Sequence, residues 1–260
     1  MGGRLLVLAA LCAATFGVGC VGESPNVSAN DADVSSPSTA KEPAPAAATD
    51  VHVLRNPQAP SHPAAGAQVR VEGLVVTGLK TVGNSHGFFL QHPTEPVWGG
   101  VYVYLGAAAP DVARGDVVTI EGVFRSYKGF DEVDVSSGAV ERTSKAPMPE
   151  PLDVSVDEIR EGGPRAAELQ SVYLVVHDVV ATRATTGVDF GVATGSGATE
   201  LIVTSYMAND LGPSPFPATA NARYSAIRGF GYRSGPSETA TVAKLAPLSA
   251  DDLELATAAP

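Results

Sequence analysis

The sequence predicts an all-β fold in which two similar closed barrels follow one another along the chain. Three observations support this prediction. Short β-rich runs separated by Gly, Pro and Asn begin at Gln68, and no helical stripe longer than about two turns interrupts them. The pattern of the first half also returns in the second half. Five strands in a unit of about 80 residues are typical of a Greek-key barrel of the OB type.

The first unit contains five predicted strands. Along the fourth, Val118, Ile120 and Phe124 share one face while polar residues take the other, which is the period of a half-buried strand. Gly73 and Gly122 fall inside strands, where a missing side chain predicts a bulge or a sharp bend. The predicted strands are Gln68–Leu79, Gly87–Gln91, Gly100–Leu105, Asp116–Ser126 and Glu132–Val140.

The second unit repeats the first. Val71–Thr77 resembles Val176–Thr182, and Ile120–Arg125 resembles Ile227–Tyr232. The starts of these segments lie 49 residues apart in the first copy and 51 in the second. An internal duplication explains such matches. The alternative is a single sandwich of about ten strands.

Each unit ends in a similar short tail. Ser155 is followed three residues later by Glu158, and Ser249 by Asp252. A serine in this relation to an acidic residue is typical of a capping box, so each tail is predicted to begin a short helix. The two tails divide the chain into two units and favour two barrels over one sandwich.

The N-terminus has the parts of a secretory signal. Arg4 precedes the uncharged run Leu5–Phe16, whose 12 residues are fewer than the roughly 20 that a spanning helix needs. Cleavage is therefore the better interpretation. Phe16–Cys20 resembles the lipobox of bacterial lipoproteins, although Gly17 stands where Leu is usual. The resemblance implies lipid attachment at Cys20 and an exported protein anchored in the cell envelope, at the periplasmic or surface face of the outer membrane. An ordinary secreted protein is the alternative.

These patterns give a domain plan. Residues 1–20 form the signal peptide and lipobox, and residues 21–65, rich in Pro, Ala and Ser, are predicted to be a disordered tether because they offer little apolar surface to bury. Residues 66–145 form the first barrel. Residues 146–167 are a linker with a short helix, and residues 168–260 form the second barrel with a short C-terminal helix.

The charge balance restricts the class of ligand. The chain has 17 basic and 28 acidic residues and a formal net charge of −11. Cleavage before Cys20 removes one basic residue, Arg4, and makes the remainder more acidic by one charge. Such acidity repels nucleic acid at long range and argues against a general phosphate-binding surface. Cys12 and Cys20 are the only cysteines, so the predicted barrels contain no disulfide.

Part of the first unit resembles a known family. The segments Gly87–Gln91, Val101–Tyr104 and Gly115–Gly122 together resemble the OB-fold domains of bacterial secreted nucleases. The resemblance covers Val69–Val140 well and Leu169–Val242 more loosely. His92 stands where those domains usually have Asp. No nuclease domain follows the barrels in this sequence, so the resemblance implies the OB fold and does not imply nuclease activity.

The strongest candidate site is aromatic. On the second predicted strand, Phe89 is on the face that points away from the core. Tyr102 and Tyr104 are on the corresponding face of the third strand. The outer face of these two strands is where OB folds bind oligonucleotides and oligosaccharides. Phe89, Tyr102 and Tyr104 are therefore predicted to form an exposed stacking platform, with Arg125 and Tyr127 beside it. The alternative is that the rings pack against the second copy or a tail.

No catalytic residues, metal ligands or cofactor site are predicted. His86 and His92 flank one strand, but no Cys or paired carboxylate joins them at the spacing of a zinc site. The first hypothesis is a non-enzymatic binding module, tethered to a membrane by its lipid, whose ligand is nucleic acid, glycan or an envelope protein. The second is an envelope structural or assembly lipoprotein whose barrels contact another protein.

Overall fold

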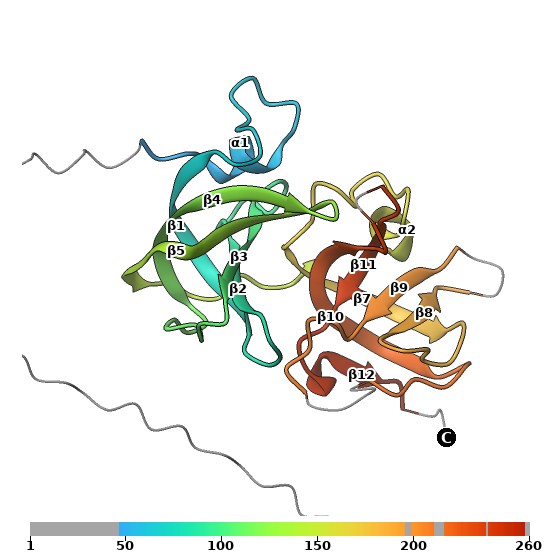
Figure 1. Ribbon diagram of the computed structural model, residues 1–260. Helices are drawn as coiled ribbons and strands as arrows, with labels where there is room; N and C mark the ends of the chain where they lie inside the picture. Colours follow the sequence, from blue (N-terminus) through green and yellow to red (C-terminus); the bar gives the residue numbers. More distant parts are fainter. Residues whose placement is uncertain (1–46, 196–198, 211–215, 238, 258–260) are drawn as a thin grey trace, which may run out of the picture. The chain divides into compact units, whose positions relative to one another are not determined.

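The computed structural model describes residues 47–195, 199–210, 216–237 and 239–257, which contain two neighbouring β-barrels (Figure 1). The predicted signal peptide, Cys20 and most of the predicted tether lie outside these residues. Five strands form the first barrel and pair in the closed order β1-β2-β3-β5-β4. They are β1 (Gln68–Lys80), β2 (His86–Gln91), β3 (Gly100–Gly106), β4 (Asp116–Tyr127) and β5 (Phe130–Lys145).

The pairing of β3 with β5 gives the first barrel its Greek-key topology. These two strands run parallel, whereas the other four pairings around the barrel are antiparallel. Residues from all five strands enclose one apolar core, which includes Phe88 and Leu90 from β2 and Val101 and Val103 from β3. The residues between them therefore face outward, as the alternation in the sequence predicts.

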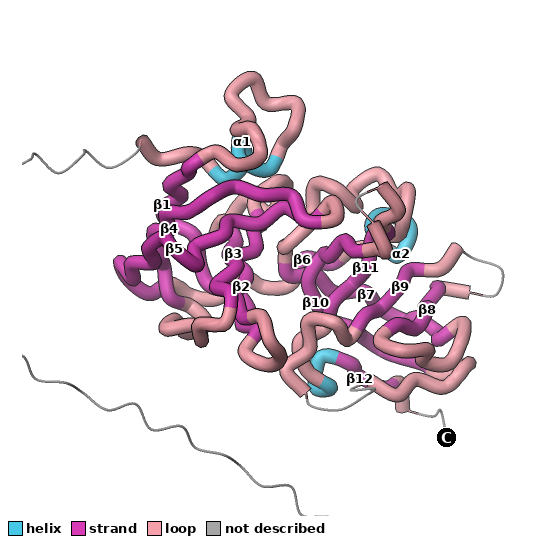
Figure 2. Tube along the Cα trace, in the orientation of Figure 1, coloured by secondary structure: helices cyan, strands magenta, loops and turns pink. Residues whose placement is uncertain are grey.

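The second barrel has the same strand order. Its strands are β7 (Tyr173–Ala181), β8 (Asp189–Ala193), β9 (Leu201–Thr204), β10 (Arg223–Ser234) and β11 (Val242–Ala246). They pair in the ring β7-β8-β9-β11-β10 because β10 also pairs with β7, and β9 and β11 are parallel. β6 (Leu152–Asp153) and β12 (Leu253–Leu255) extend this sheet at its edges (Figure 2). The prediction of an all-β fold with two OB-type barrels is confirmed.

The internal repeat corresponds to equivalent strand pairs. Val71 of β1 lies opposite Ile120 of β4 in the first barrel, and Val176 of β7 lies opposite Ile227 of β10 in the second. All four side chains are at most 1% exposed. The two repeated segments of each barrel thus pair with each other through one buried residue pair, and these pairs are equivalent in the two barrels.

Two glycines allow the first barrel to close. Gly73 has a φ of +73° and lies where the register between β1 and β4 shifts, between Val71 and Leu74. At Gly122 a Cβ atom would lie 2.5 Å from the backbone oxygen of Asp134, so only glycine fits there. Both positions are irregularities of the kind that the sequence predicts.

The prediction of a disordered tether is wrong for its last part. Residues 51–55 form the helix α1 (Val51–Arg55), and Val51 and Leu54 are buried in the first barrel's core. The side chain of Asp50 accepts a hydrogen bond from the backbone N–H of His52 at 2.7 Å and caps the helix. The physical reason is the i, i+3 spacing of Val51 and Leu54, which places both apolar side chains on one face.

The predicted linker, residues 146–167, contains the short helix expected of it. Ser155 and Glu158 form a reciprocal capping box at the start of α2 (Val156–Ile159). Val156 and Ile159 pack into the core of the second barrel, and β6 pairs with β7. The second tail forms the 3₁₀ turn η1 (Ala250–Asp252). Both tails therefore begin the short helices expected of them, and the first belongs to the second barrel.

Candidate binding site between the two barrels

A third apolar cluster joins the barrels. It contains Phe89, Tyr102 and Phe130 from the first barrel and Met207, Phe230, Tyr232 and Ala246 from the second. The rings of Phe89 and Phe230 are stacked, with centroids 4.0 Å apart and planes at 14°. This cluster explains why β10 carries large aromatic residues outside its own barrel's core.

Polar contacts reinforce this interface. The guanidinium of Arg55, whose side chain is 1% exposed, donates to the backbone oxygen of Gly100 at 2.9 Å and to Gln170 Oε1 at 3.2 Å, and it pairs with Asp131. Gln170 Nε2 donates to the backbone oxygen of Gly129 at 3.0 Å. Burial lowers the pKa of Arg55 to about 10, so it stays charged at neutral pH. Arg55 thus connects α1 and the first barrel to the segment before β7.

The prediction of an exposed aromatic platform is wrong for two of its three rings. Phe89 is 0% exposed and Tyr102 is 4% exposed. The reason is that β10 of the second barrel covers the outer face of β2 and β3, through Phe230 and Tyr232. The alternative, that the rings pack against the second copy, holds for Phe89 and Tyr102. Tyr104 is partly buried at the edge of the same cluster.

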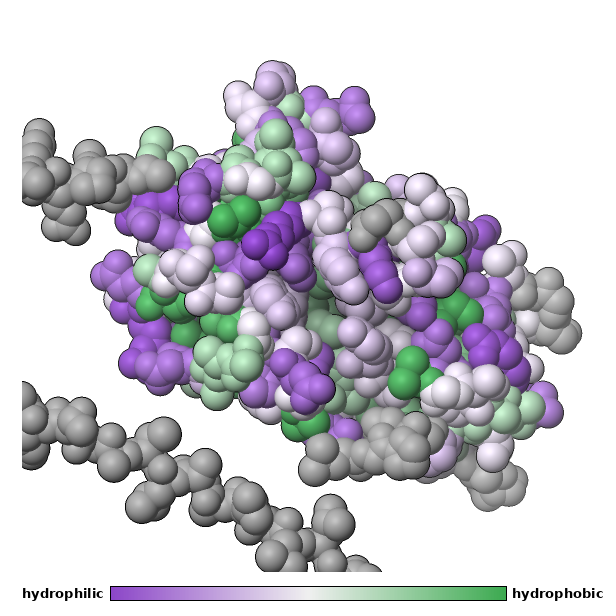
Figure 3. Space-filling model, viewed as in Figure 1, coloured by the Kyte–Doolittle hydropathy of each residue, from purple (hydrophilic) through white to green (hydrophobic). Residues whose placement is uncertain are grey.

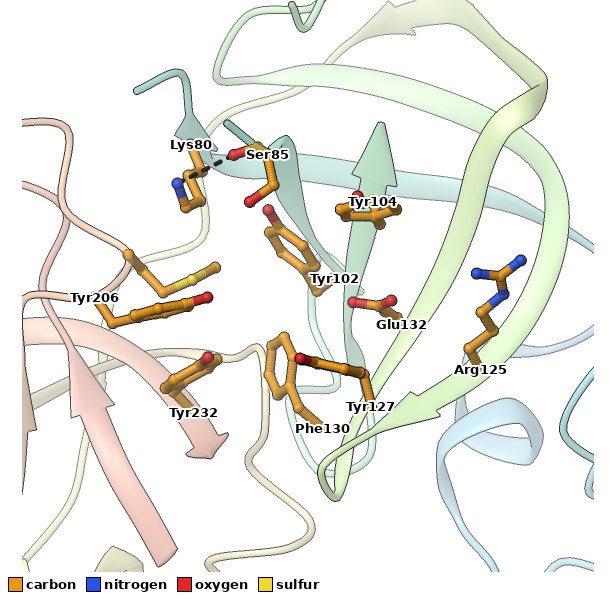
Figure 4. Close-up of a pocket in the computed structure, with 11 residues that line it drawn as sticks. Lys80, Ser85, Tyr102, Tyr104, Arg125, Tyr127, Phe130, Glu132, Tyr206 and Tyr232 are labelled. Carbon is orange, nitrogen blue, oxygen red and sulfur yellow. Dashed lines mark hydrogen bonds between the residues drawn. The ribbon is translucent and has the colours of Figure 1, made fainter. Parts of the chain in front are cut away.

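A pocket of about 380 Å³ opens beside this cluster (Figure 4). Six of its lining side chains are aromatic, and we call the site the tyrosine pocket. They are Tyr102, Tyr104, Tyr127 and Phe130 from the first barrel and Tyr206 and Tyr232 from the second. The other lining residues are Lys80, Ser85, Arg125, Glu132 and Met207. Four of the five predicted binding residues thus line one pocket, and Phe89 does not.

The rings of the tyrosine pocket lie at several angles. Phe130 meets Tyr232 edge to face at 4.8 Å between centroids, and Tyr206 stacks on Tyr232 at 6.0 Å. Tyr127 and Tyr206 are each 55% exposed, so they form the accessible part of the lining. Figure 4 shows Glu132 between Tyr104 and Tyr127, and Tyr206 and Tyr232 on the other side of Phe130. Ring faces and ring edges are therefore both available to a ligand.

The sequence analysis missed the second barrel's share of this pocket. Tyr232 occupies the repeat position of Arg125, which was a candidate residue. Applying the repeat to the site as well as to the strands would have identified Tyr232. Tyr206 follows β9 in a loop, and no periodic signal in the sequence points to it.

The charges in the pocket are arranged around Glu132. Burial, together with the nearby carboxylate of Asp134, raises the pKa of Glu132 to about 7. Arg125 forms an ion pair with Asp134 at 2.7 Å, and Lys80 Nζ donates to the backbone oxygens of Val82 and Ser85 at 2.6 and 3.1 Å. Burial also lowers the pKa of Lys80 and raises the pKa of Tyr102 and Tyr232. Both cations of the lining thus already have partners.

His86, the first residue of β2, and His92, which follows the strand, do not meet. His92 Nδ1 accepts a hydrogen bond from the backbone N–H of Glu95 at 3.0 Å, and its ring lies 5.1 Å from that of His52. His86 lies at the other end of the strand. Among the described residues, no group of three or more His, Cys, Asp or Glu side chains is arranged to hold a metal ion. In the same part of the chain, no helix has the length and hydropathy to span a membrane.

Comparisons with known proteins give no family. No protein-family model matches the chain, and no curated protein matches it. Solved structures with some similarity include an asparaginyl-tRNA synthetase from Pyrococcus horikoshii, at 20% identity and a TM-score of 0.26 over 34% of this chain and 22% of the synthetase. Another is the HINb domain of p204, at 11% identity and a TM-score of 0.31 over 74% of this chain and 98% of that domain.

A murine DNA-binding protein bound to double-stranded DNA matches at 15% identity and a TM-score of 0.33, over 74% of this chain and 97% of that chain. The chain thus spans about a fifth of the synthetase and nearly all of the other two proteins. All three TM-scores are below 0.5, so these similarities carry no conclusion about function. The resemblance of residues 69–140 to nuclease OB domains stays a prediction.

Proposed function

We propose that this chain is a non-enzymatic binding module whose ligand enters the tyrosine pocket. The observation that carries the proposal is the convergence of six aromatic side chains from two barrels on one pocket of about 380 Å³. A pocket of this size, lined by rings with a few polar groups among them, is typical of a site for a small molecule or for one unit of a polymer. Tyr127 and Tyr206 are each 55% exposed, and a ligand can stack on the parts of these rings that Lys128 and Tyr232 leave open.

The charges favour a glycan over single-stranded nucleic acid as the ligand. Proteins that bind single strands combine stacking rings with a positively charged groove that follows the phosphates. Here Arg125 is paired with Asp134, Lys80 donates to backbone oxygens, and Glu132 adds an acidic group to the wall. The whole chain is acidic as well, at −11. Aromatic faces with carboxylate and hydroxyl groups suit the apolar faces and hydroxyls of a sugar.

The second candidate function is an envelope structural or assembly protein that contacts another protein through its barrels. The burial of Phe89 and Tyr102 favours it, because these two rings serve the packing of one barrel on the other. On the face shown in Figure 3, apolar residues lie in small groups among hydrophilic ones. A protein interface usually has a contiguous apolar patch of several hundred Å². The face shown in Figure 3 therefore favours the glycan proposal.

The proposal includes attachment to a membrane. The lipobox-like segment Phe16–Cys20 supports a lipid on Cys20, and the run Leu5–Phe16 supports export. A lipid at the N-terminus would hold the two barrels near the envelope, where surface or wall polysaccharides are the abundant glycans. Anchoring and glycan binding together describe an envelope protein that holds a polysaccharide close to the membrane.

The test is binding of the full chain, in a polyoxyethylene detergent that carries no sugar, to a glycan array and to a single-stranded DNA oligonucleotide. The proposal expects binding to at least one glycan class and none to the DNA. The double variant Tyr127→Ala, Tyr206→Ala should weaken that binding about tenfold or more, because two exposed stacking faces are removed. Leu255→Ala is the matched control, since Leu255 is 65% exposed and lies on β12.

Three results would count against the proposal. Binding to DNA alone would replace glycan by nucleic acid as the ligand. Glycan binding that the double variant leaves unchanged would place the site elsewhere on the barrels. No binding to any glycan, with capture of a partner protein from envelope extract, would favour the structural role.

A further inference from the structure

Glu132 supplies a carboxylate to the lining of the tyrosine pocket. Glu132 lies opposite Tyr102 in the pairing of β3 with β5 and opposite Arg125 in the pairing of β4 with β5. Its side chain therefore lies on the face of the sheet that carries these two residues. Figure 4 shows its carboxylate beside Tyr104 and Tyr127. A carboxylate thus stands among the aromatic rings of the pocket.

Arg125 is the cation that acts on this carboxylate, and its attraction lowers the pKa of Glu132 less than burial and Asp134 raise it. Arg125 lies across the strand pair, but its guanidinium forms an ion pair with Asp134 at 2.7 Å. Lys80 donates to two backbone oxygens. The other titratable groups of the lining are tyrosines, which are neutral at pH 7, and Lys128 lies outside the lining with its Nζ 5.4 Å from the centre of the Tyr127 ring. When Glu132 is ionised, it and Asp134, which lies just outside the lining, are two carboxylates beside the one guanidinium of Arg125.

The rings add to the preference for positive charge. The face of an aromatic ring carries negative electrostatic potential and attracts ammonium groups, an effect worth more where water is excluded. Rings around a carboxylate are therefore complementary to an organic cation. The same arrangement disfavours an anion, which would meet both the ring faces and Glu132. A neutral sugar gains only stacking and hydrogen bonds.

We propose that the tyrosine pocket binds an amino sugar, with the protonated amino group donating to the Glu132 carboxylate and the sugar ring stacked on tyrosine faces. The inference rests on the proposed glycan-binding function and names the class of sugar. In this arrangement the ammonium group supplies a positive charge and hydrogen bonds to a carboxylate that burial keeps from water. The raised pKa of Glu132 agrees with a carboxylate for which burial and the nearby Asp134 outweigh the attraction of Arg125.

The experiment compares three oligosaccharides of the same linkage and length, made of glucosamine, of N-acetylglucosamine and of glucose. The first has protonated amines near neutral pH, the second has neutral amides in their place, and the third has hydroxyls. Binding to the full chain in a polyoxyethylene detergent is measured by titration calorimetry. The glucosamine oligomer should bind about tenfold or more tighter than the other two, because a hydrogen bond to a charged group is stronger than one between neutral groups.

Glu132→Gln should remove this difference, because glutamine keeps the shape of the side chain and loses its charge. Glu141→Gln is the matched control on the same strand, since Glu141 is exposed and does not line the tyrosine pocket. Circular dichroism of both variants checks that the barrels are folded. The glucosamine oligomer should bind the control as it binds the unmodified chain.

The failure of this inference differs from the failure of the proposed function. Equal affinities for the three oligomers, unchanged in Glu132→Gln, would overturn the amino-sugar inference and leave glycan binding standing. A loss of affinity in Glu132→Gln that is the same for all three would show that Glu132 shapes the pocket without selecting charge, which also overturns the inference. No binding of these oligomers, with no glycan bound on the array, would refute the proposed function itself.

Discussion

The ring of Phe89 on β2 stacks against the ring of Phe230 on β10, with 4.0 Å between their centroids. Phe89 lies outside the core of the first barrel and Phe230 outside the core of the second, yet both are at most 2% exposed. This contact makes the two barrels one structural unit. It also fixes the positions of Tyr102 and Tyr232 beside it, and hence the shape of the tyrosine pocket.

Phe230→Ala is expected to lower the free energy of unfolding by about 3–5 kcal/mol, because it leaves a cavity between the barrels. Urea unfolding followed by circular dichroism measures this change. Val188→Ala is the control, since Val188 is 40% exposed and its truncation should cost no more than about 0.5 kcal/mol. If the two variants lose similar stability, the ring pair does not hold the barrels together.

Arg55→Ala should destabilise the chain by about 3–5 kcal/mol, because it leaves Asp131 without its buried partner and removes the donor to Gly100. Arg160→Ala is the matched control. Arg160 pairs with Asp157 at 2.8 Å, but the Asp157 side chain is 72% exposed, so the loss should stay below about 1 kcal/mol. Comparable midpoints of urea unfolding for the two variants would mean that α1 does not fasten the barrels.

Glu132 should make stability depend on pH. Burial and Asp134 raise its pKa from 4.5 to about 7, so between these values the folded chain holds a proton that the unfolded chain has released. The contribution of Glu132 to stability therefore decreases as pH rises through this range. The free energy of unfolding of Glu132→Gln, relative to that of the unmodified chain, should therefore rise by at most about 3 kcal/mol from about pH 4 to about pH 8. The rise is smaller where water reaches the carboxylate.

Unfolding of both proteins in urea at the two pH values measures this gain. The same comparison for Glu141→Gln, on the exposed part of β5, should show little change. A constant difference between Glu132→Gln and the unmodified chain across this range would show that the folded state does not raise the pKa of Glu132.

Cys20→Ala should abolish lipid attachment, because Cys20 is the only cysteine after the predicted cleavage site. Metabolic labelling of the expressing bacterium with a radioactive fatty acid measures attachment. Cys12→Ala is the control, since Cys12 lies in the run that is predicted to be cleaved, and this variant should keep its label. Undiminished labelling of Cys20→Ala would end the lipoprotein interpretation.

The barrels were predictable because their signals are local or periodic. Alternation along β4, glycines at Gly73 and Gly122, and the matching segments around Val71 and Val176 all follow from strand geometry and duplication. The short helix α1 was missed because its two apolar residues, Val51 and Leu54, lie in a stretch whose average composition is that of a disordered segment.

The binding site was only half predictable. Alternation showed that Phe89, Tyr102 and Tyr104 point away from their own barrel's core, but it does not show what covers them. Whether an outward residue is exposed depends on how the second barrel packs, and that follows from non-local contacts such as Phe89 with Phe230. Sequence periodicity carries no information about such contacts.

The measurement that tests the central claim most directly is an NMR titration of the chain, with its tyrosine rings isotopically labelled, using the glycan that binds best on the array. The resonances of Tyr104, Tyr127 and Tyr206 should shift together, while that of Tyr224, in the core of the second barrel, should stay in place. Glycan binding that leaves these three resonances unchanged would contradict the claim that the tyrosine pocket is the binding site.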